Sequence, residues 1–453
     1  MSESVLVAAL GYEVRIDVSA LDAAGVLAVR EAWRDALVPV VEPAEPVEPV
    51  DAAPVVHAQG DLDRATMLSE LSMAVTLAAI EAARGQAWML HATGVASDDG
   101  RVVALVGPSG RGKTTAARVL GGSYGYVSDE TVAVGLEGSV RAYRKPLSII
   151  EHAGEPKVQR APSELGLRAL PAASLTLAAV VLLDRRDDED GAVVSPVDLG
   201  DALGDLVAQT SYLADLERPL QTIAALVSAV GGVVRVTYRE AAELVPVVEG
   251  LLAAPQEAVA AGAAEPLAAG LVGDGICRVR ARDALALEDP DRLALLHVDG
   301  HGHGTVRVLA GLGPALWRAA DGVALDDLVT VAVAAHGEPE GVDATTAVAS
   351  AVDGLVAEGV LRRSPLWRIR DDVAWTGSGE RVVALALADP AAAPVALEGS
   401  AAIIWTALAD SACDADTLIQ RVAERADVET ADVADDVRGF LRTLERGALV
   451  AAG

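Results

Sequence analysis

One stretch of the chain, residues 102–115, constrains the fold more than any other, and it reads VVALVGPSGRGKTT. Its first five residues are aliphatic and mostly β-branched, which predicts a buried strand over 102–106. The glycine-rich turn that follows allows backbone N–H groups to converge on phosphate oxygens. A helix expected over 114–120 points its N-terminus at the same anion. The stretch matches the P-loop pattern and predicts an α/β domain that binds a nucleoside triphosphate.

The expected nucleotide contacts come from the loop and the first helical turn. Lys113 neutralises phosphate charge, and the hydroxyl of Thr114 holds Mg²⁺. The predicted nucleotide-binding residues of this segment are Gly107, Ser109, Gly110, Arg111, Gly112, Lys113, Thr114 and Thr115. Lysine is rare in this chain, at positions 113, 145 and 157 only, so a lysine inside the loop is not background composition. We expect ATP and Mg²⁺ as cofactors.

The length, net charge and cysteine content of the chain limit the number of domains and the classes of partner that can be expected. A chain of 453 residues predicts two to four domains, because single cores stop growing below that size. A net charge of −30 without a cluster of Lys or Arg argues against a nucleic-acid partner. Cys277 and Cys413 are too few for a disulfide framework and read as small core residues. No basic leader or membrane-length apolar run is readable, so we expect a cytoplasmic protein without a membrane partner.

The first 253 residues alternate predicted strands and helices, the pattern of an α/β domain. Helices are expected near 28–37 and over 68–84, and strands end at Asp184 and Tyr238. A proline-rich acidic loop interrupts this domain at 41–58. Residues 254–273 are rich in Ala, Gly and Pro and predict an interdomain linker.

The region beyond the linker repeats itself at an offset of 88 residues. The matches include Arg282 with Arg370, Asp283 with Asp371, and residues 309, 311 and 317 with 397, 399 and 405. Each copy begins with short alternating strands and ends in helices. The sequence therefore predicts two duplicated modules, 274–363 and 364–453, each a small α+β domain of winged-helix-like type.

Two further patterns allow a metal interpretation, and in both we prefer a structural one. Asp184 ends an apolar strand, as a Mg²⁺ ligand of ordinary P-loop ATPases does, but an apparent exposed hairpin tip follows it. His297, His301 and His303 lie close together, but Gly and Asp around them indicate another hairpin tip and no fourth ligand is evident.

Residues 89–134 resemble the HPr kinase family, including relatives in peptide natural-product gene clusters, and the resemblance extends over about residues 1–250. The family places a histidine before the P-loop and an acidic pair after it, which His91, Asp129 and Glu130 match. It implies phosphoryl transfer with these three as catalytic residues, and the similar RKPLS segment brings Lys145 to the nucleotide. Where the family commonly has two aspartates, this chain has Asp129–Glu130. A buried structural histidine and a simple turn aspartate remain alternatives for His91 and Asp129.

Residues 396–450, and more weakly 308–328, resemble PqqD-like modules, which bind leader segments of ribosomally synthesised peptides (RiPPs). The resemblance implies that a leader strand adds to a sheet edge near 394–397 and enters a groove against the helix near 433–444. The implied peptide-binding residues are Pro394, Val395, Ala396, Leu397, Val433, Val437, Phe440, Leu441 and Leu444. A dimerisation or docking domain without bound peptide is the alternative.

These features lead to one preferred function and two alternatives. The preferred hypothesis is an ATP-dependent kinase of RiPP maturation, which holds the precursor by its leader and phosphorylates a hydroxyl side chain. The second is a non-catalytic adapter that delivers the precursor to separate modifying enzymes. Phosphorylation of an HPr-like carrier protein is the third, and it does not account for two peptide-binding modules.

Overall fold

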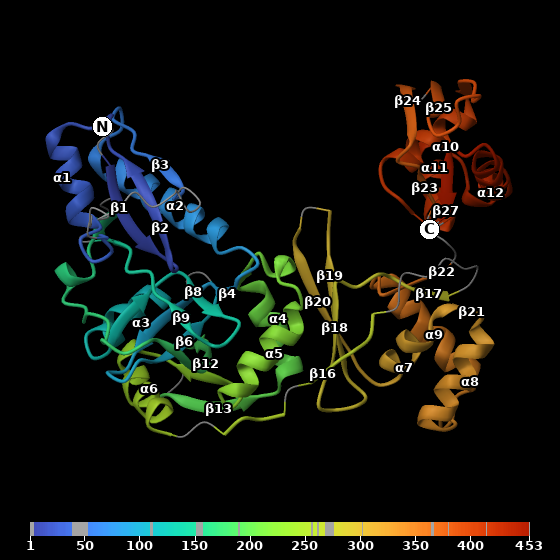
Figure 1. Cartoon of the computed structure of the whole chain (residues 1–453). Helices are drawn as coiled ribbons and strands as arrows, with labels where there is room; N and C mark the ends of the chain where they lie inside the picture. The colour runs from blue at the N-terminus through green and yellow to red at the C-terminus, as the bar shows by residue number, and fades with distance from the viewer. Residues whose placement is uncertain are drawn as a thin grey trace. The chain divides into compact units, whose positions relative to one another are not determined.

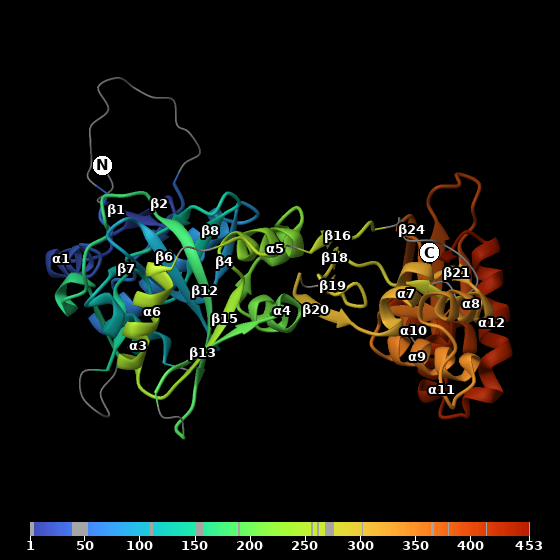
Figure 2. The same cartoon turned by 90° about the horizontal axis from the view of Figure 1, so that it is seen from below.

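The structure is a computed structural model, and the chain forms two compact units (Figures 1 and 2). Unit 1 comprises Met1–Glu265 and Ala281–Val308, and unit 2 comprises Pro266–Arg280 and Leu309–Gly453. The residues that the structure describes are 4–38, 53–108, 112–150, 157–188, 191–254, 257–260, 262–267, 276–300, 302–363, 367–378, 380–413 and 415–452.

Unit 1 begins with a small sheet and two helices. The sheet order is β1 (Ser4–Ala9), β2 (Tyr12–Asp17) and β3 (Val55–His57), and the helices are α1 (Ala23–Ala32) and α2 (Arg64–Ala82). The helix expected near 28–37 begins five residues earlier, because Asp22 accepts a hydrogen bond from the N–H of Gly25 at 2.7 Å and caps it there. The helix expected over 68–84 is confirmed as α2.

Helix α2 is, among the described residues, the one helix long and apolar enough to cross a membrane by length and composition. Its buried face includes Leu71, Val75 and Ala79, which share a hydrophobic core with the strands of the small sheet. Such packing is what the core helix of a folded domain requires.

A six-stranded sheet forms the centre of unit 1, in the order β13-β15-β12-β6-β5-β7. Its strands are β5 (Ala92–Ala96), β6 (Arg101–Val106), β7 (Gly125–Ser128), β12 (Thr176–Arg185), β13 (Val193–Val197) and β15 (Val233–Tyr238). Strands β6, β12 and β15 are parallel, and the other three pair antiparallel. The predicted strands that end near Val106, Asp184 and Tyr238 are therefore neighbours, and their carboxyl ends lie along one edge.

Shorter elements complete the α/β part of unit 1. A second sheet has the order β14 (Thr210–Ser211), β4 (Ala87–Leu90), β8 (Val132–Gly135) and β9 (Val140–Arg141), and β10 (Leu147–Ile149) pairs with β11 (Val158–Arg160). The helices are α3 (Lys113–Gly121), α4 (Leu199–Ala208), α5 (Pro219–Ala229) and α6 (Leu244–Ala253), with 3-10 turns η1 (Ser163–Leu165), η2 (Leu213–Asp215) and η3 (Ala241–Glu243).

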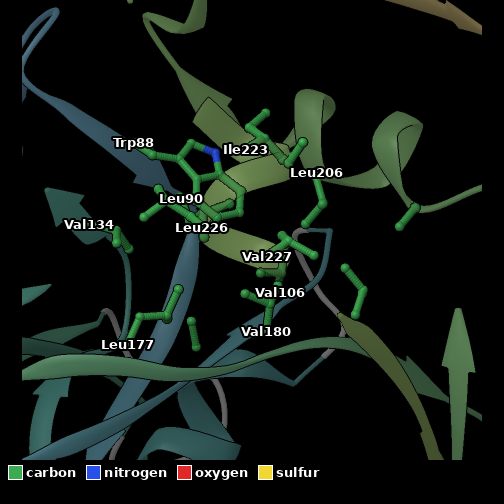
Figure 3. Close-up of a cluster of buried hydrophobic side chains, with 14 of the residues drawn as sticks. Trp88, Leu90, Val106, Val134, Leu177, Val180, Leu206, Ile223, Leu226 and Val227 are labelled. Atoms are coloured by element: carbon green, nitrogen blue, oxygen red, sulfur yellow. The ribbon is translucent and has the colours of Figure 1, made fainter. Parts of the chain in front are cut away.

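The main core of unit 1 is almost entirely aliphatic, as a chain with a single phenylalanine requires. Figure 3 shows the indole of Trp88 among Leu90, Ile223 and Leu226, with Val106 of the P-loop strand in the same cluster. Small branched side chains can pack densely without aromatic rings, provided that strands and helices approach closely. The P-loop strand is thus anchored by packing on a fully buried core.

One sheet of the first repeat belongs mainly to unit 1. The sheet order is β16 (Ala263–Ala264), β18 (Asp283–Ala286), β19 (Leu293–Val298) and β20 (Gly304–Leu309). Leu285, Leu287, Ala294 and Leu296 are buried in the core that α4 and α5 share. The predicted boundaries, a linker at 254–273 and one module over 274–363, therefore differ from the compact units, because this sheet buries one face against the nucleotide domain.

Unit 2 holds the helices of the first repeat and all of the second. The first repeat contributes β17 (Ile276–Arg278), α7 (Leu312–Ala319), β21 (Asp321–Val323), α8 (Leu325–His336), α9 (Ala344–Ala357) and β22 (Leu361–Arg363). The second comprises β23 (Trp367–Ile369), β24 (Val373–Ser378), β25 (Arg381–Ala386), β26 (Val395–Glu398), α10 (Ser400–Ala409), α11 (Ala415–Ala426), α12 (Thr430–Arg446) and β27 (Val450–Ala452). Apart from β21, the elements of the two repeats follow the same order, and β19 and β25 start 88 residues apart, at 293 and 381.

Candidate functional site

The P-loop lies between β6 and α3, as its sequence predicts. Gly112 precedes the helix with φ +87°, a left-handed conformation that favours glycine. The ammonium of Lys113 donates a hydrogen bond to the carbonyl of Gly107 at 2.5 Å, and the hydroxyl of Thr93 donates to the carbonyl of Lys113 at 3.1 Å. The ammonium group of Lys113 therefore lies against Gly107, the first residue of the predicted phosphate-binding loop. The predicted contacts Ser109, Gly110 and Arg111 lie outside the described residues.

A cleft of about 700 Å³ opens beside this loop. It brings together most of the predicted site residues from distant parts of unit 1. Its lining residues are His91, Gly112, Lys113, Thr114, Thr115, Arg118, Asp129, Glu130, Lys145, Ser148, Ile149, Ile150 and Lys157. All three lysines of the chain are among them. The cleft thus concentrates positive charge in a chain whose net charge is −30.

Asp129 follows β7 directly, and it is buried and lines the cleft. The phenol of Tyr126 donates a hydrogen bond to Asp129 Oδ1 at 2.9 Å. Burial raises the pKa of Asp129, and the lysine at 145 and the bond from Tyr126 partly oppose that rise. A carboxylate with a raised pKa is suited to accept a proton near neutral pH.

Glu130 pairs with Lys145, whose side chain is buried next to the cleft. The sequence predicted a catalytic role for Glu130 and a nucleotide contact for Lys145, and the structure places the two in direct ionic contact. Glu130, which stands where the two-aspartate pattern has its second aspartate, therefore forms an ion pair with Lys145.

His91 connects β4 to β5, and its backbone is fixed on both sides. Its N–H donates to the carbonyl of Gln209 at 2.7 Å, and the next N–H, of Ala92, donates to the carbonyl of Glu130 at 3.1 Å. Burial, and secondarily the charge of Lys113, lower the pKa of His91, which favours a neutral imidazole. The hydrogen bond between Ala92 and Glu130 joins the backbone next to His91 to the backbone of the acidic pair, and all three side chains line the same cleft.

Three lining or supporting residues were not predicted from the sequence. Arg118, one helical turn beyond Thr115, and Lys157 of the segment before β11 add positive charge to the cleft. The rarity of lysine was a signal that could have identified Lys157. Tyr126 carried no such signal, because only the folded strand brings its hydroxyl to Asp129.

Asp184 lies at the carboxyl end of β12, next to the P-loop strand, with its side chain 19% exposed. Residues 185–188, where the exposed hairpin tip was predicted to begin, are exposed, and Asp184 itself lines a separate cavity of about 320 Å³ with Gly107 and Arg235. Its carboxylate accepts a hydrogen bond from Arg186 Nε at 2.9 Å. Within the described residues, no group of three or more His, Cys, Asp or Glu side chains is arranged to hold a metal ion, and His301 lies outside them.

The predicted peptide-binding strand is β26, which has one neighbour, β25, among the described strands of its sheet. Pro394, Val395 and Ala396 are exposed there. Leu397 is instead buried in the module core, whereas Val395, on the same face of the strand, is 41% exposed.

The predicted groove helix is α12, and its apolar face is mostly internal. Val437, Leu441 and Leu444 are buried in the core of the module and offer no surface to a ligand, which corrects their predicted role. Val433 and Phe440 are half-buried at the margin of that core. These two remain the accessible part of the predicted groove on α12.

Comparison with known proteins gives three findings. Residues 385–450 match the family model "Coenzyme PQQ synthesis protein D (PqqD)", so the second module contains a PqqD domain. The solved "Structure of the Hpr(Ser) kinase/phosphatase from Coxiella burnetii" matches with 12% sequence identity and a TM-score of 0.19, covering 36% of this chain and 93% of that one. No curated protein matches the chain.

Proposed function

We propose that the chain binds ATP with Mg²⁺ in the P-loop cleft, captures a RiPP precursor through its PqqD domain, and transfers a phosphoryl group to a hydroxyl of that peptide. The observation that carries the proposal is the convergence of all three lysines and Arg118 on a cleft that also holds His91, Asp129 and Glu130. Four cations beside a P-loop match the charge of a triphosphate, and two acids supply a proton acceptor.

The residues present fit a magnesium nucleotide. The hydroxyl of Thr114 and the carboxylates of the acidic pair are hard oxygen donors of the type that Mg²⁺ prefers. When bound, the ion would neutralise charge on the β- and γ-phosphates.

In the proposed transfer, an acceptor hydroxyl oxygen attacks the γ-phosphorus, the bond from that phosphorus to the bridging β–γ oxygen breaks, and ADP leaves. Asp129 takes the proton of the hydroxyl, a role for which burial has raised its pKa. Lys113 and Lys145 attract the phosphate oxygens, and neutral His91 orients the neighbouring acids.

Strand addition is the proposed mode of peptide capture. The exposed edge of β26 offers unpaired backbone groups to an extended leader segment, and Val433 and Phe440 offer apolar contacts. Tethering the leader raises the concentration of the acceptor segment at the cleft to roughly millimolar for a short flexible linker. The first repeat is proposed as a second module of the same winged-helix-like type.

A specific observation favours the adapter as a second candidate. The ion pair between Glu130 and Lys145 occupies both an acid and a lysine that transfer would use. In an adapter, this pair would stay closed, and the unit would bind nucleotide without transferring phosphate.

One incubation separates the two candidates. The precursor peptide is mixed with the chain, ATP and Mg²⁺, and its mass is followed, with Lys113→Ala as the inactive control. A kinase adds one phosphate only with the unsubstituted chain. An unchanged peptide mass at saturating protein, with peptide binding intact, would exclude transfer and leave the adapter.

A further inference from the structure

The four cations of the P-loop cleft differ in whether they have partners. The ammonium groups of Lys113 and Lys145 are bonded locally, one to a loop carbonyl and the other to a carboxylate. Arg118 and Lys157 also line the cleft, and both are exposed. Neither of these two forms a hydrogen bond or an ion pair with any residue that the structure describes. Since acidic side chains outnumber basic ones by 66 to 36 in this chain, two unpaired cations in one cleft are a local source of available positive charge.

The part of the cleft that carries Lys157 is the β10–β11 hairpin. Ser148 pairs with Gln159 across the two strands, and the same register, continued by two residues, places Ile150 opposite Lys157. Paired residues and residues two apart along a strand share a face, so Ser148, Ile150 and Lys157 lie on one face of the hairpin. All three line the cleft, and Ile150 is 57% exposed. This face thus offers a hydroxyl, an apolar side chain and a cation to a ligand in the cleft.

Ser148 is held in place by its cross-strand partner. Gln159 Nε2 donates a hydrogen bond to Ser148 Oγ at 3.1 Å, and Gln159 itself is 8% exposed. A hydroxyl that accepts this bond can still donate its own proton. Two cations and a hydroxyl donor that line one cleft suit an anionic oxygen ligand, because hydrogen bonds to ionised acceptors are short and strong. A carboxylate of a peptide and a phosphate of the nucleotide both have this chemistry.

Arg118 reaches the cleft from α3, one turn after the P-loop threonines. Residues three and four apart share a helix face, so Arg118 lies on the same face as Thr114 and Thr115. A helix rises about 1.5 Å per residue, which places Arg118 about 6 Å beyond Thr114 along the axis. An extended peptide advances about 3.3 Å per residue, so this distance corresponds to about two peptide residues. A group bound at Arg118 would therefore lie about two residues from a hydroxyl at the phosphate site.

We propose that Arg118, Lys157 and Ser148 hold the carboxylate of an acidic residue of the acceptor peptide, about two positions from its reactive hydroxyl. Mg²⁺ neutralises part of the triphosphate charge, and Lys113 and Lys145 attract the phosphate oxygens, so the four cations divide between two ligands. Ile150 offers an apolar contact to the residues around the acid. The inference rests on the proposed function in placing peptide and nucleotide in one cleft, but recognition of the acid requires no phosphoryl transfer.

The probe is a synthetic peptide, Gly-Glu-Ala-Ser-Ala-Glu-Gly, which has a glutamate two positions from the serine on either side, and the control peptide has glutamine in place of both. Each carries a neutral fluorophore and is titrated with the full chain, with and without Mg²⁺ and a non-hydrolysable ATP analogue, while anisotropy is followed. We expect the acidic peptide to bind about tenfold more tightly than the control peptide. Arg118→Ala combined with Lys157→Ala should remove this preference, whereas Arg30→Ala, at an exposed arginine of α1, should retain it.

Calorimetry with ATP and Mg²⁺ distinguishes the two sources of an anionic oxygen. The double variant should bind ATP within about twofold of the unsubstituted chain. The inference is overturned by equal affinity for the two peptides, by a preference that persists in the double variant, or by a loss of ATP affinity in that variant, which would assign both cations to the nucleotide. A preferred acidic peptide that gains no phosphate would contradict the proposed transfer and support this inference. A peptide that gains phosphate without any preference for acid would do the reverse.

Discussion

The hydrogen bond from Tyr126 to Asp129 allows the proposed proton acceptor to be tested directly. Tyr126→Phe removes the phenol that donates to Asp129 Oδ1 at 2.9 Å. This bond favours the carboxylate and opposes the rise in pKa that burial causes. A hydrogen bond to a charged group contributes about 1.5–3 kcal/mol, and one pKa unit corresponds to about 1.4 kcal/mol. The pKa of Asp129 should therefore rise further in Tyr126→Phe.

The assay is a pH titration of aspartate carboxyl carbons by NMR, in which Asp129→Asn identifies the resonance. Tyr124→Phe is the matched control and should leave the titration midpoint unchanged. In folded Tyr126→Phe, Asp129 binds its proton more tightly than it does in the unfolded chain. The free energy of unfolding of this variant should therefore fall as pH rises through the folded-state pKa of Asp129. Equal midpoints for Asp129 in the unsubstituted chain and in Tyr126→Phe would refute the reasoning.

Three further predictions concern other parts of the molecule. Asp283→Ala should lower the free energy of unfolding of unit 1 by about 2–4 kcal/mol in chemical denaturation, because it leaves the first turn of α5 without its acceptor. Asp371→Ala, at an aspartate whose side chain is 93% exposed, should change the free energy of unfolding of unit 2 by less than about 0.5 kcal/mol. Val395→Asp should weaken precursor binding in calorimetry by about tenfold or more, since it places charge on the proposed strand edge, and Arg442→Ala on the exposed side of α12 should not. The His91 ring should titrate below its ordinary pKa of 6.5 in proton NMR, and a higher midpoint would contradict its burial.

Local patterns made the nucleotide part of the fold predictable. The apolar run before Gly107 and the helix after Gly112 depend on interactions within a few residues, so the strand and the helix occur where expected. The start of α1 was placed too late because the cap by Asp22 was not recognised.

Long-range packing was not predictable in the same way. The 88-residue period predicts two related modules, but it does not identify the core that covers each sheet. The packing of β18–β20 within unit 1 depends on hydrogen bonds that Arg282 and Asp283 form with the turn before α5 and with its first residues. These partners lie more than sixty residues away in sequence. Helical periodicity likewise predicted which residues form the apolar face of α12. It did not distinguish Val437, which is buried, from Phe440, which is accessible.

The central claim is that the lysine-lined cleft binds a nucleoside triphosphate, and calorimetry with ATP and Mg²⁺ tests it most directly. We predict one saturable site in the unsubstituted chain. Lys113→Ala should weaken it by roughly 30-fold to 150-fold, equivalent to about 2–3 kcal/mol for a lost charge-assisted contact. An absence of binding, or equal affinity in Lys113→Ala, would contradict the account.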